Sequence, residues 1–405
     1  MTTRIAVLKF GGTSVANAQA RVTAFERIAD ARADGYAVAA VVSAMGRAPE
    51  PYATDSLLAL LGGRSASPNA DVLLASGELI AASVFAEELC ARDIEARALS
   101  GAQAGFITND VHGDAAILRV EPHRVLALLE RNIVPIVAGF QGISEDGVVT
   151  TLGRGGTDLS AIALGDALDA ERVDIYTDVS GVMTADPRRI PHARTIARAS
   201  LEEISELAEH GAKVMHHKAA AYATRTQTAY AIKGLASDCG TLVDESVDHH
   251  RAVTGVTASG RLTWIRAIRG DIENPTQRMQ TELEMFRRLA RAEISIDQVS
   301  INQAGVAFVV DGDRGNEVRQ LLGDLNLAVR VREGCSKLSV VGAGMRTIPG
   351  VVHRIVVALS QANVEIIHCT DSNITVSILV PEGDVARAEA AVHDQFHLDQ
   401  GGDST

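Results

Sequence analysis

Aromatic and basic residues are both scarce in this chain of 405 residues. Phe, Tyr and Trp together make up 3% of it, which argues against a carbohydrate or nucleic-acid binder that works by aromatic stacking. Lys and Arg number 38 against 51 Asp and Glu, so the net charge is −13. An acidic chain repels the phosphate backbone, and bulk nucleic-acid binding is therefore disfavoured.

Long apolar runs are also missing. No run approaches the roughly 20 apolar residues that span a bilayer, so no membrane segment is expected. The apolar stretch at residues 5–8 ends at Lys9 and is too short for the core of a signal peptide. The four cysteines are scattered and show neither CxxC pairing nor a zinc-like spacing with histidine. They are interpreted as buried free thiols of a cytoplasmic protein.

The length predicts about two to three domains, at roughly 150 residues each. Ala, Val, Leu, Ile and Gly dominate the composition, which suits buried parallel strands flanked by helices. The continuous apolar run at residues 37–43 is typical of a strand buried on both faces, and residues 5–9, 133–138 and 173–177 are predicted as strands of the same kind. Residues 16–33 have helical spacing. Strands that alternate with helices predict a mostly parallel sheet over about the first 240 residues.

Ligands of such sheets bind beyond the carboxyl ends of the strands. Polar, Gly-rich segments follow three predicted strands, at residues 11–14, 43–46 and 177–181. A binding site is therefore expected where these three segments meet.

An internal repeat follows a polar boundary at residues 239–251. Similar runs at 291–297 and 361–367, offset by 70 residues, each follow an amphipathic helix, at 281–291 and 351–362. We interpret each run as the start of a strand. Each copy then gives a second strand and a second helix, at 306–310 and 314–322 in the first copy and at 374–380 and 385–396 in the second. This element order predicts two ferredoxin-like α+β units, unless the similarity arises by chance.

The loop after the first strand combines Lys9 with Gly11 and Gly12. Two glycines let backbone N–H groups approach a phosphate, and a cation at the strand end points to the same place. The spacing matches neither the dinucleotide motif nor the P-loop, and a simple tight turn is the alternative. A second Gly-rich segment, residues 150–161, adds Arg154, which suits bidentate carboxylate binding, and Asp158.

Together these segments resemble the amino acid kinase family and, within it, the aspartate kinases. The resemblance covers nearly the whole chain, and the repeat is similar to the tandem ACT domains of that family. It implies the amino acid kinase fold, a mostly parallel central sheet sandwiched by helices, in the α/β class. The matching motifs are KFGGTSV at 9–15, VVSAMG at 41–46, ATDSLL at 53–58, SGELI at 76–80, TTLGRGGTD at 150–158, TDVSGVMTADPR at 177–188 and GAKVMH at 211–216.

The resemblance implies transfer of the γ-phosphoryl group of ATP to the β-carboxylate of L-aspartate, the first step toward lysine, threonine and methionine. A carboxylate nucleophile has no proton to lose, so catalysis should rest on positioning and charge neutralisation, with Mg²⁺ carried by the nucleotide. Lys9 and Asp158 would be the catalytic pair. The remaining implied ATP contacts are Gly11, Gly12, Thr177, Asp178, Met183, Arg188 and Lys213, and the implied aspartate contacts are Ser43, Thr54, Glu78 and Arg154.

Simpler roles remain open for three of these residues. Glu78 could be a charge near a helix N-terminus, Thr54 a helix cap and Lys213 a solvated surface lysine. The acidic chain needs a locally positive site for two anionic substrates, so Lys9, Arg154, Arg188 and Lys213 are expected to converge there. The adjacent His216 and His217 point in different directions on a helix, so no metal site is expected from them.

The chain departs from the family pattern in two places. His216-His217-Lys218 stands where His-Pro-Arg is frequent, and residues 228–233 end in Lys233 where the family often has arginines. An ammonium does not replace a guanidinium neutrally at a bidentate site. These departures therefore affect the ATP contacts that the resemblance implies, whereas the catalytic pair matches the family pattern.

ACT domains imply a feedback amino acid, namely lysine, threonine or meso-diaminopimelate, and at least a homodimer. A purely structural ACT pair is the alternative. Effector contacts implied by the resemblance are Ile294, Asp297, Gln298 and Asn302 in the first copy and Met345, Val351, Asn363 and Val364 in the second. Residues 369–373 and the run 51–58 resemble the bacilli-type branch that responds to diaminopimelate.

The predicted organisation is a catalytic domain at 1–245, a first ACT domain with its linker at 246–333 and a second at 334–405. Two other functions stay open at this point. The chain could phosphorylate another acidic acceptor in a specialised pathway, or it could be a non-catalytic amino-acid sensor.

Overall fold

The computed structural model describes residues 3–212, 214–237, 239–245, 251–269, 274–325 and 327–400. They form two compact units, each assembled from separate stretches of chain. The first unit takes residues 1–182, 195–209 and 213–247, and the second takes 183–194, 210–212 and 248–405. The predicted domain limits at 245/246 and 333/334 stay predictions.

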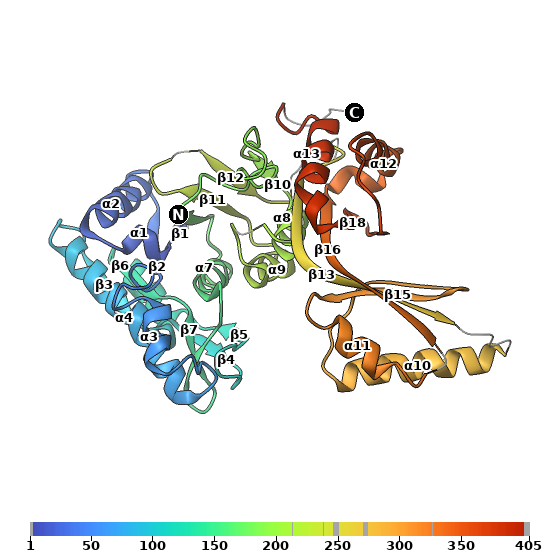
Figure 1. Ribbon diagram of the computed structural model, residues 1–405. Helices are drawn as coiled ribbons and strands as arrows, with labels where there is room; N and C mark the ends of the chain where they lie inside the picture. Colours follow the sequence, from blue (N-terminus) through green and yellow to red (C-terminus); the bar gives the residue numbers. More distant parts are fainter. Residues whose placement is uncertain are drawn as a thin grey trace. The chain divides into compact units, whose positions relative to one another are not determined.

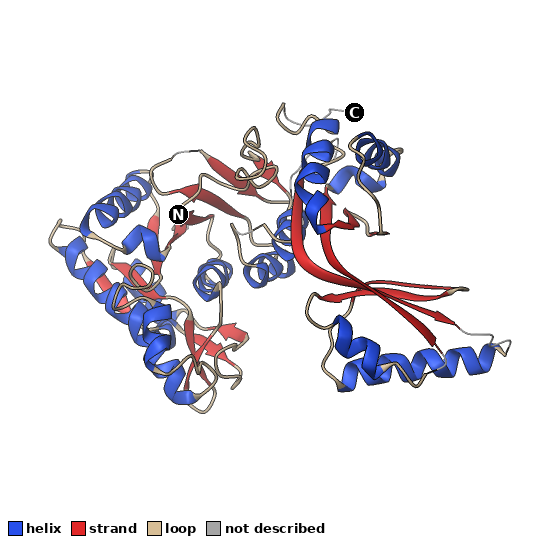
Figure 2. Ribbon diagram, in the orientation of Figure 1, coloured by secondary structure: helices blue, strands red, loops and turns tan. Residues whose placement is uncertain are grey.

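The first unit is built on an eight-stranded sheet in which every neighbouring pair is parallel except β11–β12. Figure 2 shows helices on both sides of its strands. The strands in spatial order are β10 (Arg198–Ala199), β12 (Gly240–Val243), β11 (Tyr230–Gly234), β9 (Arg172–Thr177), β1 (Ile5–Phe10), β2 (Ala37–Val42), β6 (Val134–Ala138) and β3 (Ala96–Leu99).

A smaller four-stranded sheet and nine helices complete the described part of this unit. The small sheet runs in the order β5 (Ile117–Val120), β4 (Phe106–Thr108), β7 (Gln141–Ser144) and β8 (Val149–Thr151). The helices are α1 (Gly12–Val15), α2 (Ala18–Ala33), α3 (Thr54–Leu60), α4 (Pro68–Cys90), α5 (Gly101–Ala104), α6 (His123–Leu129), α7 (Gly156–Ala167), α8 (Leu201–Glu209) and α9 (His217–Thr226).

Strand β1 shows why this sequence forms a central strand. All six of its residues are buried, as a strand covered on both faces requires. Alternate side chains point to opposite faces. Leu8 and Phe10 enter the core formed with α2 and α4, where the Phe10 and Phe85 ring centroids lie 5.6 Å apart. Lys9, between them, faces the side that α7 covers.

The second unit is built on a six-stranded antiparallel sheet. Its order is β14 (Asp297–Asn302), β15 (Gly305–Asp311), β13 (Gly255–Arg269), β16 (Leu327–Val341), β18 (Thr375–Pro381) and β17 (His368–Asp371). Its helical segments are α10 (Pro275–Arg291), α11 (Gly315–Leu321), η1 (Ala343–Arg346), α12 (Val351–Gln361), η2 (Glu382–Asp384) and α13 (Val385–Gln395).

The two long strands β13 and β16 run through both copies of the repeat. The first part of β13 pairs with the last part of β16, and the pairing shifts register near Ser259. Each copy keeps its own core, one around Phe308 and Met285 and the other around Phe396 and Ile355. Figure 1 shows α10 and α11 beside one half of the sheet, and α12 and α13 beside the other.

The 70-residue repeat is confirmed at the level of single residues. Glu293 and Asn363 both take left-handed backbone angles, with φ of 52°, directly after α10 and α12. The predicted start of a strand at each repeat signature is wrong, because these turns delay β14 to Asp297 and β17 to His368. The predicted helix at 281–291 begins earlier, since Asn274 caps it and Pro275 occupies its first turn.

The cysteine interpretation needs one correction. All four thiols are free, but Cys90, Cys239 and Cys369 are exposed and Cys335 alone is buried. No helix of the described chain is long and apolar enough to cross a membrane.

Candidate active site

Lys9 forms a nearly buried ion pair with Asp158. Its Nζ lies 2.7 Å from Oδ1 of Asp158, and the two side chains are 9% and 15% exposed. Asp158 occupies the first turn of α7, where a carboxylate is favoured by the helix dipole. A Cβ placed on Gly11 would lie 3.2 Å from the Lys9 ammonium. The ammonium therefore lies beside the backbone of the Gly-rich loop, as the sequence motif suggested.

Gly12 brings this loop into contact with the segment that follows β2. The N–H of Gly46 donates to the carbonyl oxygen of Gly12 at 3.0 Å. A Cβ on Gly12 would lie 2.9 Å from the carbonyl oxygens of both Ala44 and Gly46, so no side chain fits there. Since β1 and β2 are parallel neighbours, both segments lie at the same edge of the sheet.

Glu78 is a carboxylate inside the protein, with only 2% of the residue exposed on α4. Burial raises the pKa of Glu78 to about 8, although hydrogen bonds from the Ala44 backbone and the Thr54 side chain oppose the rise. Its Oε2 is buried and has no hydrogen-bond partner. Two of the predicted aspartate contacts, Thr54 and Glu78, thus lie side by side, Ser43 precedes the Ala44 backbone that contacts Glu78, and the free oxygen suits a ligand ammonium group.

Arg154 stands in the loop before α7, between two glycines with φ of 73°. A Cβ on Gly155 would overlap the His216 side chain, and one on Gly153 would overlap Asp114. Arg154 is exposed. Asp114 accepts an ion pair from Lys218, which ties the start of α9 to this loop. Sequence reasoning missed Asp114, which has no motif around it.

Thr177 ends β9, and its hydroxyl donates to the carboxylate of Asp178, the next residue. Partial burial raises the pKa of Asp178, but hydrogen bonds from Thr177 and Arg47 outweigh that effect, and the net shift is downward. Nη2 of Arg47 lies 2.9 Å from Oδ2 of Asp178. Sequence reasoning also missed Arg47, although it directly follows the 41–46 motif and its charge could have indicated it.

Two other predicted ATP contacts lie in the second unit. Met183 and Arg188 belong to segment 183–194, and Arg188 forms an exposed ion pair with Asp186 at 2.7 Å. Lys213 lies outside the described residues. The expected convergence of Lys9, Arg154, Arg188 and Lys213 therefore stays a prediction.

Lys233, which stands where the family often has arginine, forms an ion pair with Asp174. Its Nζ lies 3.0 Å from Oδ2 of Asp174, whose side chain is 1% exposed and also pairs with Arg172 at 2.6 Å. Lys233 thus helps to neutralise a buried carboxylate between parallel strands.

A cavity of about 580 Å³ lies in the second copy of the repeat. Two of the predicted effector residues, Met345 and Val351, line it, whereas Asn363 and Val364 do not. Val364 is buried in the core of this copy. The remaining lining residues are Val352, Asp371, Ser372, Asn373 and Val376.

The predicted effector residues of the first copy make contacts within the chain. Nζ of Lys337 lies 2.5 Å from Oδ2 of Asp297, and Gln298 donates to the Ser377 carbonyl oxygen at 3.0 Å. Ile294 is buried in the core of the first copy, and Asn302 ends β14.

Comparison with known proteins identifies the family. The amino acid kinase family matches residues 4–233, and the ACT domain matches residues 338–396. The chain belongs to the amino acid kinase family. Its relatives include "Aspartokinase 1" of Bacillus subtilis (strain 168), 42% identical over 404 residues that cover 98% of this chain and 99% of that one. The aspartokinase of Geobacillus stearothermophilus is 36% identical and covers 97% of both chains.

Solved structures similar to this chain are also aspartokinases. E. coli aspartokinase III in complex with aspartate and ADP (R-state) has a TM-score of 0.78 at 27% identity, over 97% of this chain and 100% of that one. The same enzyme with lysine and aspartate (T-state) has a TM-score of 0.72 at 26% identity, over 96% and 99%. The chain is a phosphotransferase of the aspartokinase type with an ACT regulatory region, and as a kinase it uses ATP.

Proposed function

We propose that this chain transfers the γ-phosphoryl group of ATP to the β-carboxylate of L-aspartate at the site formed by Lys9, Glu78 and the loops between them. The observation that carries this proposal is the buried oxygen of Glu78 without a partner. An α-ammonium group would satisfy that oxygen, with Ser43 and Thr54 as neighbouring hydrogen-bond partners. Arg154 would then receive a carboxylate of the same substrate.

The chemistry requires charge neutralisation rather than a base. An oxygen of the β-carboxylate attacks the γ-phosphorus, the bond to the β–γ bridging oxygen breaks, and ADP leaves. The carboxylate carries no proton, so none has to be removed. The Lys9 ammonium and the amides of the Gly11–Gly12 loop would stabilise charge on the transferred group. Asp158 would hold Lys9 in place through the 2.7 Å contact.

We expect Mg²⁺ to enter the site bound to the nucleotide. The two carboxylates predicted to lie in the ATP site are already paired, Asp158 with Lys9 and Asp178 with Arg47. A magnesium ion would therefore take its oxygen ligands from the ATP phosphates and from water. When bound, it would neutralise phosphate charge.

The test is an assay with ATP, Mg²⁺ and L-aspartate in which hydroxylamine traps the acyl phosphate. We expect the hydroxamate of aspartate to form. Product from another acid but none from aspartate would overturn the substrate assignment. No product from any acid would overturn the kinase function and leave a non-catalytic sensor.

We also propose that the 580 Å³ cavity binds a feedback amino acid. Its lining residues include the carboxylate of Asp371, the polar side chains of Ser372 and Asn373, and the apolar side chains of Met345 and Val351. This composition suits a small zwitterion with an aliphatic stem. Activity titrations with lysine, threonine and meso-diaminopimelate, alone and in pairs, test it. Absence of inhibition by all three would overturn it.

A homodimer or larger oligomer and a cytoplasmic location are part of the same proposal. Light scattering at working concentration tests the first, and a monomer would overturn it. The second rests on four free thiols, which suit a reducing compartment.

A further inference from the structure

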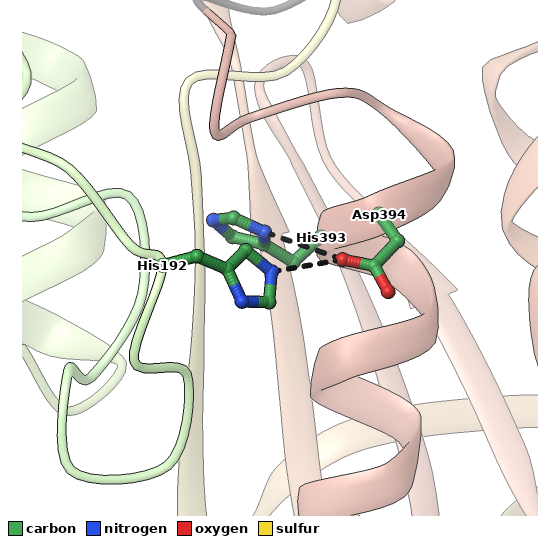
Figure 3. Close-up of side chains that lie close together, drawn as sticks. All are labelled: His192, His393 and Asp394. Atoms are coloured by element: carbon green, nitrogen blue, oxygen red, sulfur yellow. Dashed lines mark hydrogen bonds and ion pairs between the residues drawn. The ribbon is translucent and has the colours of Figure 1, made fainter.

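Segment 183–194 packs against α13 inside the second unit, through side chains on one face of that helix. Nε of Arg189 lies 2.6 Å from Oε2 of Glu389, and the Thr184 hydroxyl lies 3.0 Å from Nε2 of His393, one turn further along. Beside these contacts, His192 approaches the end of α13. Figure 3 shows His192, His393 and Asp394 converging there.

These three side chains hold their ligand atoms close together. Nε2 of His192 lies 3.0 Å from Oδ1 of Asp394, and Nδ1 of His393 lies 3.8 Å from the same oxygen. All three atoms fall within 4.8 Å of one another. In the part of the chain that the structure describes, no other group of three His, Cys, Asp or Glu residues meets this condition.

The buried member of the cluster has an unmet polar atom. His393 is fully buried, and its Nδ1 has no hydrogen-bond partner. The 3.8 Å gap to Asp394 is too long for a hydrogen bond. The other ring nitrogen, Nε2, is engaged by Thr184, which fixes the ring and leaves Nδ1 facing the cluster. A cation would satisfy Nδ1, because a neutral imidazole nitrogen offers it a lone pair.

The spacing is close to that of a tetrahedral zinc site. Ligand atoms at about 2.0–2.2 Å from Zn²⁺ lie about 3.4 Å from each other. The two separations from Oδ1 of Asp394, 3.0 and 3.8 Å, bracket that value, and the two imidazole ligand atoms lie within 4.8 Å of each other. Two imidazoles and one carboxylate form a donor set that binds zinc and its neighbouring divalent metals in preference to Mg²⁺ or Ca²⁺. The His192 side chain is 49% exposed and that of Asp394 64% exposed, so an ion can reach the cluster from solvent.

We propose that His192, His393 and Asp394 form a Zn²⁺ site that joins segment 183–194 to α13, with water as the fourth ligand. The Thr184 hydroxyl is the outer-shell partner that orients His393. The simpler arrangement is a hydrogen bond from His192 to Asp394 with the two imidazole rings packed edge to face at 5.0 Å. That arrangement leaves Nδ1 of His393 unsatisfied, whereas a bound ion satisfies it.

The test uses the untagged full chain after treatment with a chelator. Zn²⁺ is titrated in competition with a chromophoric chelator, and Co²⁺ is titrated alone to record the visible absorption of a four-coordinate ion. We expect one equivalent of metal per chain. His192→Ala and Asp394→Asn should each weaken Zn²⁺ binding at least tenfold, and both positions are exposed, so the fold should survive.

His353→Ala is the matched control, because His353 is an exposed histidine of the same unit on α12. It should bind Zn²⁺ like the original chain, and added Zn²⁺ should raise the melting temperature of both but not that of His192→Ala. Substoichiometric binding, binding that survives both ligand substitutions, or an equal loss in His353→Ala would overturn the site. Kinase activity is not a readout here, so the outcome is independent of the proposed function.

Discussion

Lys9 and Asp158, 149 positions apart in the sequence, form a contact of 2.7 Å between the end of β1 and the first turn of α7. The ion pair fixes the Lys9 ammonium beside the Gly-rich loop, where a phosphate has access to backbone amides. Substituting the two residues separates the cation's own contribution from its positioning.

Lys9→Met should lower kcat by about 10²- to 10³-fold, since it removes a cation that acts on the transferred phosphoryl group. Asp158→Asn keeps the cation but loosens it, and we expect a smaller fall, about tenfold. Asp166→Asn, an exposed carboxylate on the same helix, is the control and should leave kcat unchanged. Steady-state assays of ADP release measure all three, and near-normal turnover by Lys9→Met would contradict the mechanism.

Glu78→Gln should raise the KM for aspartate by about 100-fold or more, because the buried partner of the ammonium can then no longer ionise. The KM for ATP should change little. Glu87→Gln lies on the same helix at an exposed position and serves as the control. Equal effects on both substrates would show that Glu78 supports the fold rather than aspartate.

The pH dependence of stability follows from the same carboxyl group. Its pKa is about 8 in the folded chain against an ordinary glutamate pKa of 4.5, so the unfolded chain loses this proton first as pH rises. Stability is therefore greatest below about pH 4.5 for this group and falls between about pH 5 and 8 by roughly 2–4 kcal/mol. Urea unfolding at several pH values should show this decline in Glu87→Gln and a weaker one in Glu78→Gln. Identical slopes would contradict the burial effect.

Arg189→Ala should destabilise the second unit by about 3 kcal/mol, because it leaves the fully buried carboxylate of Glu389 without its cation. Arg188→Ala removes a neighbouring guanidinium that is 75% exposed and should cost less than about 0.5 kcal/mol. Denaturant unfolding measures both. The reverse order would mean that the Arg189–Glu389 pair does not hold segment 183–194 in place.

Gly12→Ala should lower both activity and stability, the latter by about 1–3 kcal/mol, because its Cβ would lie 2.9 Å from two carbonyl oxygens. Gly383→Ala meets nothing within 4 Å and is the control. Circular dichroism melts and turnover are the measurements. Wild-type behaviour of Gly12→Ala would mean that the two loops can separate without loss.

Much of this fold was predictable because its signals are local. The apolar run at 37–43 is β2, and the 70-residue offset reappears as the matching turns at Glu293 and Asn363. The start of α10 was missed because its first turns are polar and carry no apolar periodicity, although the cap at Asn274 could have shown it.

The residues of the site were predicted from motifs. Motifs do not indicate which residues far apart in the sequence come into contact. The pairing of Lys218 with Asp114, and of Arg47 with Asp178, joins positions more than 100 apart with no pattern linking them. Likewise, the predicted catalytic domain at 1–245 includes segment 183–194, which the structure groups with the second unit. The contacts of this segment there depend on side chains of α13, such as Glu389 and His393.

That dependence sets an order of events on the ribosome. Glu389 is synthesised 200 residues after Arg189. At about 5–20 residues per second, this delay amounts to roughly 10–40 seconds of synthesis. Strand β13 also leaves the exit tunnel before its partner β16 is made. A nascent chain therefore exposes the edges of β13 until β15 and β16 emerge, and segment 183–194 until α13 emerges. Chaperones that hold exposed strands would be able to bind in these intervals.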